Sequence, residues 1–353
     1  MTPIILDCTL RDGSYSINFQ FSYEDTLQIV SVFDRLKIPY IEVGHGMGLG
    51  ASDQTKFIAA ETDERYMHAT ANSCKSSKWG VFCIPGIAKL ENLDCPIDYA
   101  MNFIRIGTDV DNYKEARPFI EKAKKAGLFV CSNIMKSYVS SPDEFATLAY
   151  DIHKFGADLI YIVDSAGGMF PEDVVSYVKA VKEKVPSMQI GFHGHNNLQL
   201  GITNSLASIE HGVTIVDTSF QGLGRSAGNT PTELFLAVLQ RRGFYNDLDI
   251  IDYLDFGEKY IQPLIQQKGY NSLDIVCGIA QFHSSYMPII YEYSKKYRVD
   301  PRLLILELVK ITRTTAPENL VNDLALKLSQ EDAKGIWKPS YPNYFGSEQS
   351  NAA

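Results

Sequence analysis

The sequence predicts a parallel (β/α)8 barrel, which is the TIM-barrel architecture, followed by a C-terminal helical lobe. Two observations lead to this prediction. Short apolar runs alternate eight times with amphipathic segments over roughly the first 240 residues, and from residue 245 onward the amphipathic segments continue without such runs between them. Eight βα units suit a closed barrel better than an open parallel sheet, which commonly has five or six strands.

The eight apolar runs are the predicted strands. Strands that are buried on both faces read as continuous apolar runs, and the runs here have ordinary strand lengths. Each would be followed by one helix of the barrel. In chain order the runs are residues 3–8, 40–44, 80–84, 102–107, 128–134, 157–164, 188–193 and 213–218.

Helix start and stop signals separate these runs. The segment SYED at residues 22–25 has the capping pattern of a helix N-terminus, and an apolar stripe follows at residues 27, 30, 33 and 36. The segment SPDE at residues 141–144 opens a second helix, which Gly156 closes. Gly127 and Gly212 end two more helices just before the next strand begins. Helices and strands therefore alternate as a barrel requires.

The sequence divides into three parts on this basis. Residues 1–243 are predicted to form the (β/α)8 barrel, residues 244–336 a C-terminal helical domain, and residues 337–353, which are rich in Pro, Ser, Asn and Tyr, an irregular tail. The helices predicted in the second part are residues 253–267, 273–297, 301–312 and 317–328.

Composition indicates an ordinary globular protein of the cytoplasm. The 353 residues are 45% hydrophobic and 21% charged, and the net charge of −9 disfavours nucleic acid or an anionic membrane as a partner. No apolar run reaches the ~20 residues of a membrane span, and the N-terminus lacks the basic segment and long apolar core of a signal peptide. The six cysteines are scattered without a Cys-x-x-Cys pair, which is typical of buried thiols in a cytoplasmic protein.

The clearest chemical signal is His193-Gly194-His195, at the end of the seventh predicted strand. Alternate strand residues point to the same side, so both imidazoles are aimed at one point. Asp12, just past the end of the first strand, is the best candidate for a third ligand. One carboxylate with two imidazoles suits a divalent ion such as Mn, Mg, Fe, Co or Zn, with open positions for a substrate. A buried, hydrogen-bonded histidine pair is the alternative interpretation.

Other polar residues gather where the predicted strands end, which is where barrel enzymes carry their chemistry. Arg11 follows the first strand, and a guanidinium beside a metal ion can hold a developing enolate oxygen. Glu42 and His45 lie at the second strand and could bind substrate. Glu42 could instead form an ion pair with Arg105 inside the barrel.

Three further segments have competing interpretations. Asp164 and Ser165 end the sixth strand, although Asp164 could simply cap the turn that follows. Lys136 follows the fifth strand and could be a Schiff-base lysine, but a metal site makes that second electrophile redundant. The segment GLGRSAGN at residues 222–229 superficially suggests a dinucleotide loop. Its Gly-x-Gly-x-x-x-Gly spacing and its place after the eighth strand argue against NAD.

Together these segments resemble the metal-dependent pyruvate-lyase TIM-barrel superfamily, the HMGL-like proteins. That superfamily contains 4-hydroxy-2-oxovalerate aldolases, hydroxymethylglutaryl-CoA lyases and the isopropylmalate, citramalate and homocitrate synthases. The motifs that carry the resemblance occur in the right order over about residues 3–240. They are TLRDG (9–13), IEV (41–43), DSAG (164–167), HGHNNL (193–198) and GLGRSAGN (222–229).

Within the superfamily, the chain looks most like the hydroxy-oxo-acid aldolases. The segments LRDGS at residues 10–14 and FQF at residues 19–21 are similar to that branch. The synthases usually carry an acidic residue and Gln right after the glycine of the first motif, where this chain has Ser14 and Tyr15. The CoA lyases carry a catalytic cysteine in the glycine loop, where this chain has Arg225 and Ser226.

The resemblance implies a metal site and a substrate site. Arg11 and Ser165 would contact the 2-oxo acid, and Glu42 and His45 complete the predicted substrate-binding set. The ion would be Mn or Mg, with Co or Zn as alternatives. Its implied ligands are Asp12, His193 and His195, with Asn229 as a fourth or outer ligand.

One pair of positions departs from the aldolase pattern. Characterised aldolases typically have an acid/base histidine two residues after the glycine of the first motif, where this chain has Tyr15, and a tyrosine where this chain has His283. The two side chains are exchanged, so Tyr15 or His283 would be the acid/base. We favour His283 because an imidazole titrates nearer neutral pH than a phenol. The alternative is that His283 is an ordinary helix residue and the chemistry or substrate has drifted.

We therefore expect a divalent-metal-dependent class II aldolase that cleaves a 4-hydroxy-2-oxo acid to pyruvate and an aldehyde, or forms it from them, through a metal-stabilised enolate. The resemblance also implies that the helical lobe docks an acylating aldehyde dehydrogenase, and we expect a homo-oligomer. Two alternatives stay open. One is a Claisen-type acyl-CoA condensing enzyme or an HMG-CoA-lyase-like enzyme, and the other is a catalytically silent barrel that binds a partner.

Overall fold

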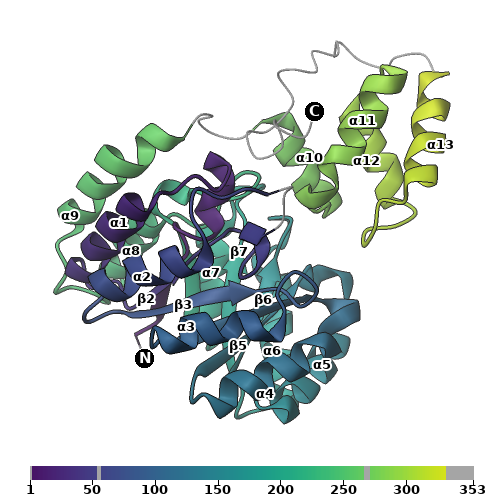
Figure 1. Cartoon of the computed structure of the whole chain (residues 1–353). Coiled ribbons are helices and arrows are strands. Elements are labelled where there is room, and N and C mark those ends of the chain that lie inside the picture. Colours follow the sequence, from purple (N-terminus) through teal and green to yellow (C-terminus); the bar gives the residue numbers. More distant parts are fainter. Residues whose placement is uncertain (1, 54–56, 266–270, 331–353) are drawn as a thin grey trace.

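The computed structural model describes residues 2–53, 57–265 and 271–330 (Figure 1). Eight parallel strands form a closed barrel in chain order, with β1 (Ile4–Asp7) hydrogen-bonded to β8 (Ile215–Thr218). The predicted (β/α)8 barrel is therefore confirmed, and each strand lies within two residues of its predicted run. The other strands are β2 (Tyr40–Val43), β3 (Lys78–Cys83), β4 (Phe103–Asp109), β5 (Phe129–Met135), β6 (Leu159–Asp164) and β7 (Gln189–Gly194).

The helices around the barrel begin at the residues that the capping signals indicate. Ser22 caps α1 (Tyr23–Arg35) by accepting from the N–H of Asp25, whose carboxylate accepts from the N–H of Ser22 at 2.9 Å. The same reciprocal pair, Ser141 and Glu144, opens α5 (Pro142–Phe155), which ends at Gly156 with a φ of +103°. The remaining barrel helices are α2 (Asp63–Ser73), α3 (Asp94–Asp98), α4 (Arg117–Lys125), α6 (Pro171–Lys184), α7 (Gly201–Glu210) and α8 (Thr232–Arg241).

The barrel interior changes from apolar to charged along the strands. A buried apolar cluster that includes Phe103, Leu159 and Ile215 fills its lower part. Arg105 lies two residues further along β4 than Phe103, so both side chains face the same side of the strand. Arg105 and Glu42 have no exposed side-chain surface. The layer of the interior next to the carboxyl ends of the strands is therefore built from charges.

Two hydrophobic clusters divide the helices that follow the barrel. α9 (Ile250–Phe256) packs on the barrel side, because Tyr253 and Phe256 belong to the main cluster. The four helices of the lobe share a second cluster and lie together beyond one end of the barrel (Figure 1). The predicted domain limits at residues 243 and 336 stay predictions, and the tail at residues 337–353 lies outside the described residues. The lobe helices are α10 (Ser272–Ala280), α11 (Met287–Tyr297), α12 (Pro301–Val309) and α13 (Glu318–Ser329).

The single helix predicted at residues 273–297 is wrong, because the structure has two helices there. α10 is terminated by Gln281 in the left-handed conformation, with a φ of +50°, and a proline occupies the first turn of α11. His283 lies in the connection between them. The apolar pattern runs across this break, so periodicity alone did not reveal it.

The helix predicted at residues 253–267 also has different bounds. The α-helix begins earlier, at Ile250, and ends at Phe256. The chain continues in wider and then tighter helical turns to Leu264, and residues 266–267 lie outside the described part. Pro263, which cannot donate a backbone hydrogen bond, stands in the last of these turns.

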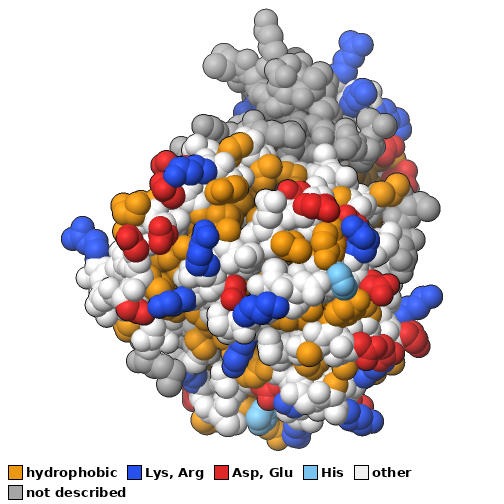
Figure 2. Space-filling model, turned by 60° about the vertical axis from the view of Figure 1, so that its left-hand side comes forward, with side chains coloured by type: hydrophobic (Ala, Val, Ile, Leu, Met, Phe, Trp, Pro, Cys, Tyr) orange, Lys and Arg blue, Asp and Glu red, His pale blue; other side chains and the backbone are white. Residues whose placement is uncertain are grey.

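The surface carries charges of both signs. On the face that Figure 2 shows, acidic and basic side chains are interspersed with hydrophobic ones, without a large area of one charge. No helix in the described part of the chain is long and apolar enough to cross a membrane.

Candidate active site

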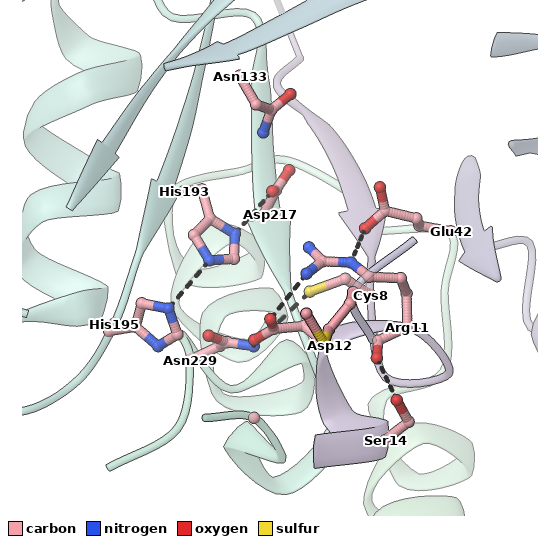
Figure 3. Close-up of polar contacts among 12 residues, drawn as sticks. Cys8, Arg11, Asp12, Ser14, Glu42, Asn133, His193, His195, Asp217 and Asn229 are labelled. Carbon is pink, nitrogen blue, oxygen red and sulfur yellow. Dashed lines mark hydrogen bonds and ion pairs between the residues drawn. The ribbon is translucent and has the colours of Figure 1, made fainter. Parts of the chain in front are cut away.

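Asp12, His193 and His195 converge at the carboxyl ends of β1 and β7 (Figure 3). Their ligand atoms all lie within 4.8 Å of one another, and all three side chains are buried. The turn after β1 presents Asp12, because the carbonyl of Cys8 accepts from the N–H groups of Arg11, Asp12 and Gly13 at 3.1, 2.8 and 3.2 Å. The Nε2 atoms of the two imidazoles lie 3.4 Å apart.

The two histidines offer nitrogen lone pairs to this centre. Nδ1 of His193 lies 2.8 Å from Oδ2 of Asp217. Burial would raise the pKa of Asp217, but Arg105 and the hydrogen bond to His193 lower it overall, so Asp217 is an ionised acceptor. His193 must then donate from Nδ1, which leaves the lone pair on Nε2. Burial lowers the pKa of His195 to about 3, so the ring of His195 is neutral.

Asn229 supplies a further oxygen beside the triad. Its Nδ2 donates to Oδ2 of Asp12 at 2.8 Å, while its buried Oδ1 has no hydrogen-bond partner among the described residues. A buried acceptor without a partner is costly unless a ligand occupies it. Two imidazoles, one carboxylate and one amide oxygen together suit a divalent ion, so the residues present fit the metal that the sequence implied.

A chain of buried charges connects the triad to Arg11. Arg11 donates from Nη1 to Asp12 at 2.8 Å and from Nε to Glu42 at 2.6 Å. Glu42 also accepts from Nη1 of Arg105 at 2.8 Å, and Nη2 of Arg105 pairs with Asp217. The alternative prediction of an internal Glu42–Arg105 pair is therefore confirmed. Glu42 orients the guanidinium of Arg11, so it acts on the site through its neighbour.

The charges of this chain keep Asp12 ionised. Burial on its own would raise the pKa of Asp12, but the guanidinium of Arg11, which donates to it at 2.8 Å, brings it well below its usual range. The guanidinium of Arg11 lies over the ring of Phe82, 4.6 Å from its centroid, and that ring covers one face of the cation.

His283 reaches the barrel mouth from the lobe. It lies before η9 (Ser284–Tyr286), and its Nδ1 accepts from the backbone N–H of Ser285 at 3.2 Å and lies 2.6 Å from the Ser285 hydroxyl. Burial, followed by the charges of Arg225 and Lys136, lowers the pKa of His283 well below its ordinary value. The ring is therefore neutral, and with Nδ1 accepting from Ser285 it carries its proton on Nε2.

Tyr15 lies beside the glycine loop at the barrel mouth. It belongs to η1 (Asp12–Ile17), the turn that also begins with Asp12. The guanidinium of Arg225 lies 4.5 Å above its ring centroid, and Phe19 meets the ring edge-on at 5.0 Å. Arg225 is thus a neighbour of Tyr15 and also acts on the charge state of His283.

The side chain of His45 is hydrogen-bonded to backbone groups. Its Nε2 lies 3.0 Å from the carbonyl of Phe57, and its Nδ1 accepts from the N–H of Met47 at 3.0 Å. Its ring stacks on Phe19 at 4.2 Å, and burial lowers its pKa to about 4. Both ring nitrogens are used, so these contacts favour a structural role for His45 over the predicted substrate contact.

Two residues predicted at the end of β6 hold loops together. Asp164 accepts from the N–H groups of Gly168 and Met169 at 3.1 and 3.0 Å, which confirms the alternative that it caps this turn. Ser165 accepts from the N–H of Lys136 at 2.9 Å. A contact between Ser165 and the 2-oxo acid stays a prediction.

Lys136 joins the barrel to the lobe. Its Nζ lies 2.9 Å from Oδ2 of Asp109 and 2.8 Å from the hydroxyl of Tyr286. Burial would lower the pKa of Lys136, but Asp109 and Tyr286 raise it overall. A charged, paired lysine is a poor nucleophile, which disfavours a Schiff base here.

Asp217 and Arg225 are the functional candidates that the sequence reasoning missed. Asp217 lies two residues after Ile215 on β8, so the strand period that places Ile215 inside the barrel also turns Asp217 inward. The sequence signal that could have identified Asp217 is a carboxylate at an inward position of a buried strand. Arg225 was visible in the glycine loop, but it was used only to compare family branches.

Comparison with known proteins finds similarity along almost the whole chain. The family model described as HMGL-like matches residues 2–258. A protein named 4-hydroxy-2-oxovalerate aldolase from Geobacillus genomosp. 3 is 36% identical over 332 residues, which cover 94% of this chain and 98% of that protein. A protein of the same name from Carboxydothermus hydrogenoformans is 35% identical over 327 residues, covering 92% and 97% of the two chains.

Solved structures with a similar fold include the N-terminal domain of a putative aldolase from Bacteroides vulgatus. It has a TM-score of 0.68 and 27% identity, and the match covers 88% of this chain and 97% of that one. The carboxyl transferase domain of Rhizobium etli pyruvate carboxylase with pyruvate and biocytin has a TM-score of 0.75, covering 96% and 64% of the two chains. Its 15% identity shows a shared fold only.

Proposed function

Because the chain belongs to the HMGL-like family, we propose that it is a divalent-metal-dependent aldolase that cleaves a 4-hydroxy-2-oxo acid to pyruvate and an aldehyde, or forms it from them. It is a carbon–carbon lyase. The observation that carries the proposal is the buried Asp12–His193–His195 cluster with the Arg11 guanidinium bonded directly to Asp12. The guanidinium of Arg11 and the candidate metal site are thus adjacent, so one 2-oxo acid can contact both.

The proposed metal ligands are Asp12, His193 and His195, with Asn229 as the fourth. A divalent ion held there, Mn or Mg with Co or Zn as alternatives, would supply a Lewis acid for the 2-oxo group. Arg11 would donate to the oxyanion of the pyruvate enolate, because its Nε and Nη1 are engaged by Glu42 and Asp12 while no bond among the described residues occupies its Nη2.

The proposed acid/base is His283, with Tyr15 as a hydrogen-bond partner of the substrate. In cleavage, the 4-hydroxyl proton would move to Nε2 of the neutral His283 ring. This requires the tautomer with its proton on Nδ1, which would donate to the Ser285 hydroxyl, 2.6 Å away, in place of the bond from the Ser285 N–H. In synthesis, the doubly protonated ring would return the Nε2 proton to the aldehyde oxygen as the new C–C bond forms, which leaves the ring neutral.

Three further features remain predictions. They are a cytoplasmic location, assembly into a homo-oligomer, and docking of an acylating aldehyde dehydrogenase on the helical lobe.

Deuterium exchange of pyruvate tests the proposed function. With Mn or Mg in deuterated water, the protein should exchange the methyl protons of pyruvate without any CoA thioester, because forming the enolate requires only the ion, Arg11 and a base. Loss of the methyl signal in proton NMR measures the exchange. Asp12→Ala and His193→Ala should lose both the exchange and the bound metal while they keep the fold.

Two results would contradict the proposal. Exchange that appears only with an acyl-CoA would indicate a Claisen-type condensing enzyme or a CoA lyase. Absence of both bound metal and exchange in the wild-type protein would indicate a catalytically silent barrel.

A further inference from the structure

Arg225 is a cation at the barrel mouth for which the described residues supply no counter-charge. Its side chain is half-buried, and its buried Nε has no hydrogen-bond partner in the described part of the chain. No ion pair of the described residues includes it, whereas the other two cations at the mouth are neutralised. Arg11 pairs with Asp12 and Glu42, and Lys136 pairs with Asp109.

The loop that carries Arg225 has its shape set by backbone bonds. The carbonyl of Arg225 accepts from the N–H of Gly228 at 2.8 Å, and the N–H of Asn229 donates to the carbonyl of Gly222 at 3.0 Å. Gly228 has a φ of +83°, and a Cβ there would overlap the carbonyl oxygen of Gly222. The hydroxyl of Ser16 also donates to the carbonyl of Gly224 at 2.8 Å. The guanidinium is therefore presented from a closed loop rather than from a loose surface segment.

The position of Arg225 relates it to the acid/base end of the site. The guanidinium covers the ring of Tyr15 at 4.5 Å. Its charge also helps to lower the pKa of His283, after burial as the main cause. The hydroxyl of Ser226, the next residue in the loop, donates to Asp274 of α10 at 3.1 Å, so the loop is joined to the lobe that carries His283. Arg11, in contrast, is bonded to Asp12, where the 2-oxo acid is proposed to bind.

We propose that Arg225 binds an anionic group on the aldehyde half of the substrate. The inference rests on the proposed aldolase function and specifies its substrate class: a 4-hydroxy-2-oxo acid that carries a second carboxylate, or a phosphate, beyond C4. A partly buried guanidinium without a counter-ion is costly, and a carboxylate or phosphate can accept two parallel hydrogen bonds from it. A substrate that ends in a methyl group would leave Arg225 unpaired.

Reaction in the direction of synthesis tests this with pyruvate and matched aldehydes. The carboxylate pairs are glyoxylate against acetaldehyde and succinic semialdehyde against butanal. The phosphate pair is glyceraldehyde 3-phosphate against glyceraldehyde. In the wild-type protein, kcat/KM should favour the anionic member of at least one pair by about 10- to 100-fold, which is the usual contribution of a charge-assisted hydrogen bond. The pair with the larger ratio identifies carboxylate or phosphate as the group.

Variants test whether Arg225 causes the preference for the anionic aldehyde. Arg225→Met should bring the ratio in the preferred pair close to one, and Arg225→Lys should retain part of it, because an ammonium keeps the charge without the planar fork. Arg65→Met is the matched control. The Arg65 guanidinium also lies over a tyrosine ring, at 4.7 Å from Tyr23, but it is exposed and ion-paired with Glu61. This control should keep the wild-type ratio.

The outcomes separate this inference from the function on which it rests. If wild-type protein exchanges the pyruvate methyl protons but does not prefer an anionic aldehyde in any pair, the inference is overturned and the aldolase stands. An unchanged ratio in a folded Arg225→Met also overturns it. If the wild-type protein shows no exchange at all, the aldolase proposal itself fails.

Discussion

Asp217 is not one of the proposed metal ligands, yet its bond to His193 decides which nitrogen of that ring carries the proton. Its Oδ2 accepts from Nδ1 of His193 and also pairs with Arg105. Arg105 pairs in turn with Glu42, which binds Arg11. One buried chain of charges therefore orients a proposed metal ligand at one end and the proposed enolate-binding cation at the other.

Replacing Asp217 by Asn should weaken metal binding. An amide can donate to Nδ1 of His193 and thereby place the ring proton on Nε2, the nitrogen that would otherwise bind the metal ion. Partners of this kind typically contribute about 10- to 100-fold in metal affinity. Calorimetric titration of the metal-free protein with Mn measures the effect directly. The control is Asp158→Asn, which removes an ion pair with Lys124 outside the barrel, at 2.8 Å. Equal Mn affinity in Asp217→Asn and wild type would refute the orienting role.

His283→Ala should lower kcat by ~10²–10⁴-fold, the usual contribution of a positioned acid/base. Tyr15→Phe should cost less, because the hydroxyl of Tyr15 is proposed only to bind substrate. The double exchange Tyr15→His with His283→Tyr should keep more activity than either single exchange if the two side chains share one proton path. Steady-state turnover across the pH range provides the measurement. Near-wild-type turnover by His283→Ala would leave His283 as a structural residue of the lobe.

At the scale of elements, the lobe completes the site because α10 packs directly on barrel loops. The side chain of Asn197, just after β7, donates to the backbone carbonyl of Asp274 in α10 at 3.0 Å. Gly168, in the turn after β6, lies so close to α10 that a Cβ there would overlap the carbonyl oxygen of Gly278. This close approach and the Lys136–Tyr286 contact place His283 at the mouth.

Gly168→Ala should therefore separate α10 from the barrel and lower kcat for cleavage by at least about tenfold, because acid/base chemistry depends on the position of His283. Pyruvate exchange by Gly168→Ala should show whether His283 is also the base that forms the enolate. Loss of the exchange would indicate that it is, and unchanged exchange would indicate another base. The control is Gly127→Ala at the end of α4. It has a φ of +79° and open space around it, so an alanine there costs backbone strain without touching the lobe. If Gly127→Ala and Gly168→Ala lose kcat equally, general destabilisation is the cause.

For the whole molecule, burial of His45 makes the folded state sensitive to acid. The ordinary pKa near 6.5 falls to about 4 in the folded protein. Between these values the unfolded chain binds a proton at His45 that the folded protein does not, so the free energy of unfolding falls as pH falls. Asp7 acts in the opposite direction, because burial raises its pKa to about 7. The contribution of His45 must therefore be isolated by comparing variants.

His45→Gln should show less loss of stability on acidification than the wild-type protein. From pH 7 to pH 5, the free energy of unfolding of the wild type should fall by about 2 kcal/mol more than that of the variant. Urea unfolding at both pH values measures the difference. His211→Gln, which removes an exposed histidine, should behave like the wild type. A wild-type slope in His45→Gln would show that other groups cause the acid sensitivity.

The sequence by itself determined the eight strands, their order and the side chains at their carboxyl ends. Apolar runs and glycine stops are local signals, and the parallel strands of a closed barrel all end at one rim. This is why the sequence predicts that Asp12 and His193, 181 positions apart in the chain, lie in one site. The capping pairs at Ser22 and Ser141 were likewise readable, because each lies within four residues.

Only the tertiary structure decided which charges meet inside the barrel and which residues the lobe adds. Arg105 reaches Asp217 across 112 positions, and Lys136 reaches Tyr286 across 150, so no local pattern specifies either contact. The same holds for His45, whose ring nitrogens are used by the backbone around it, and for Arg225, which forms no ion pair with any residue that the structure describes. Partner choice in a buried, low-dielectric interior depends on three-dimensional distance, and the sequence does not contain that distance.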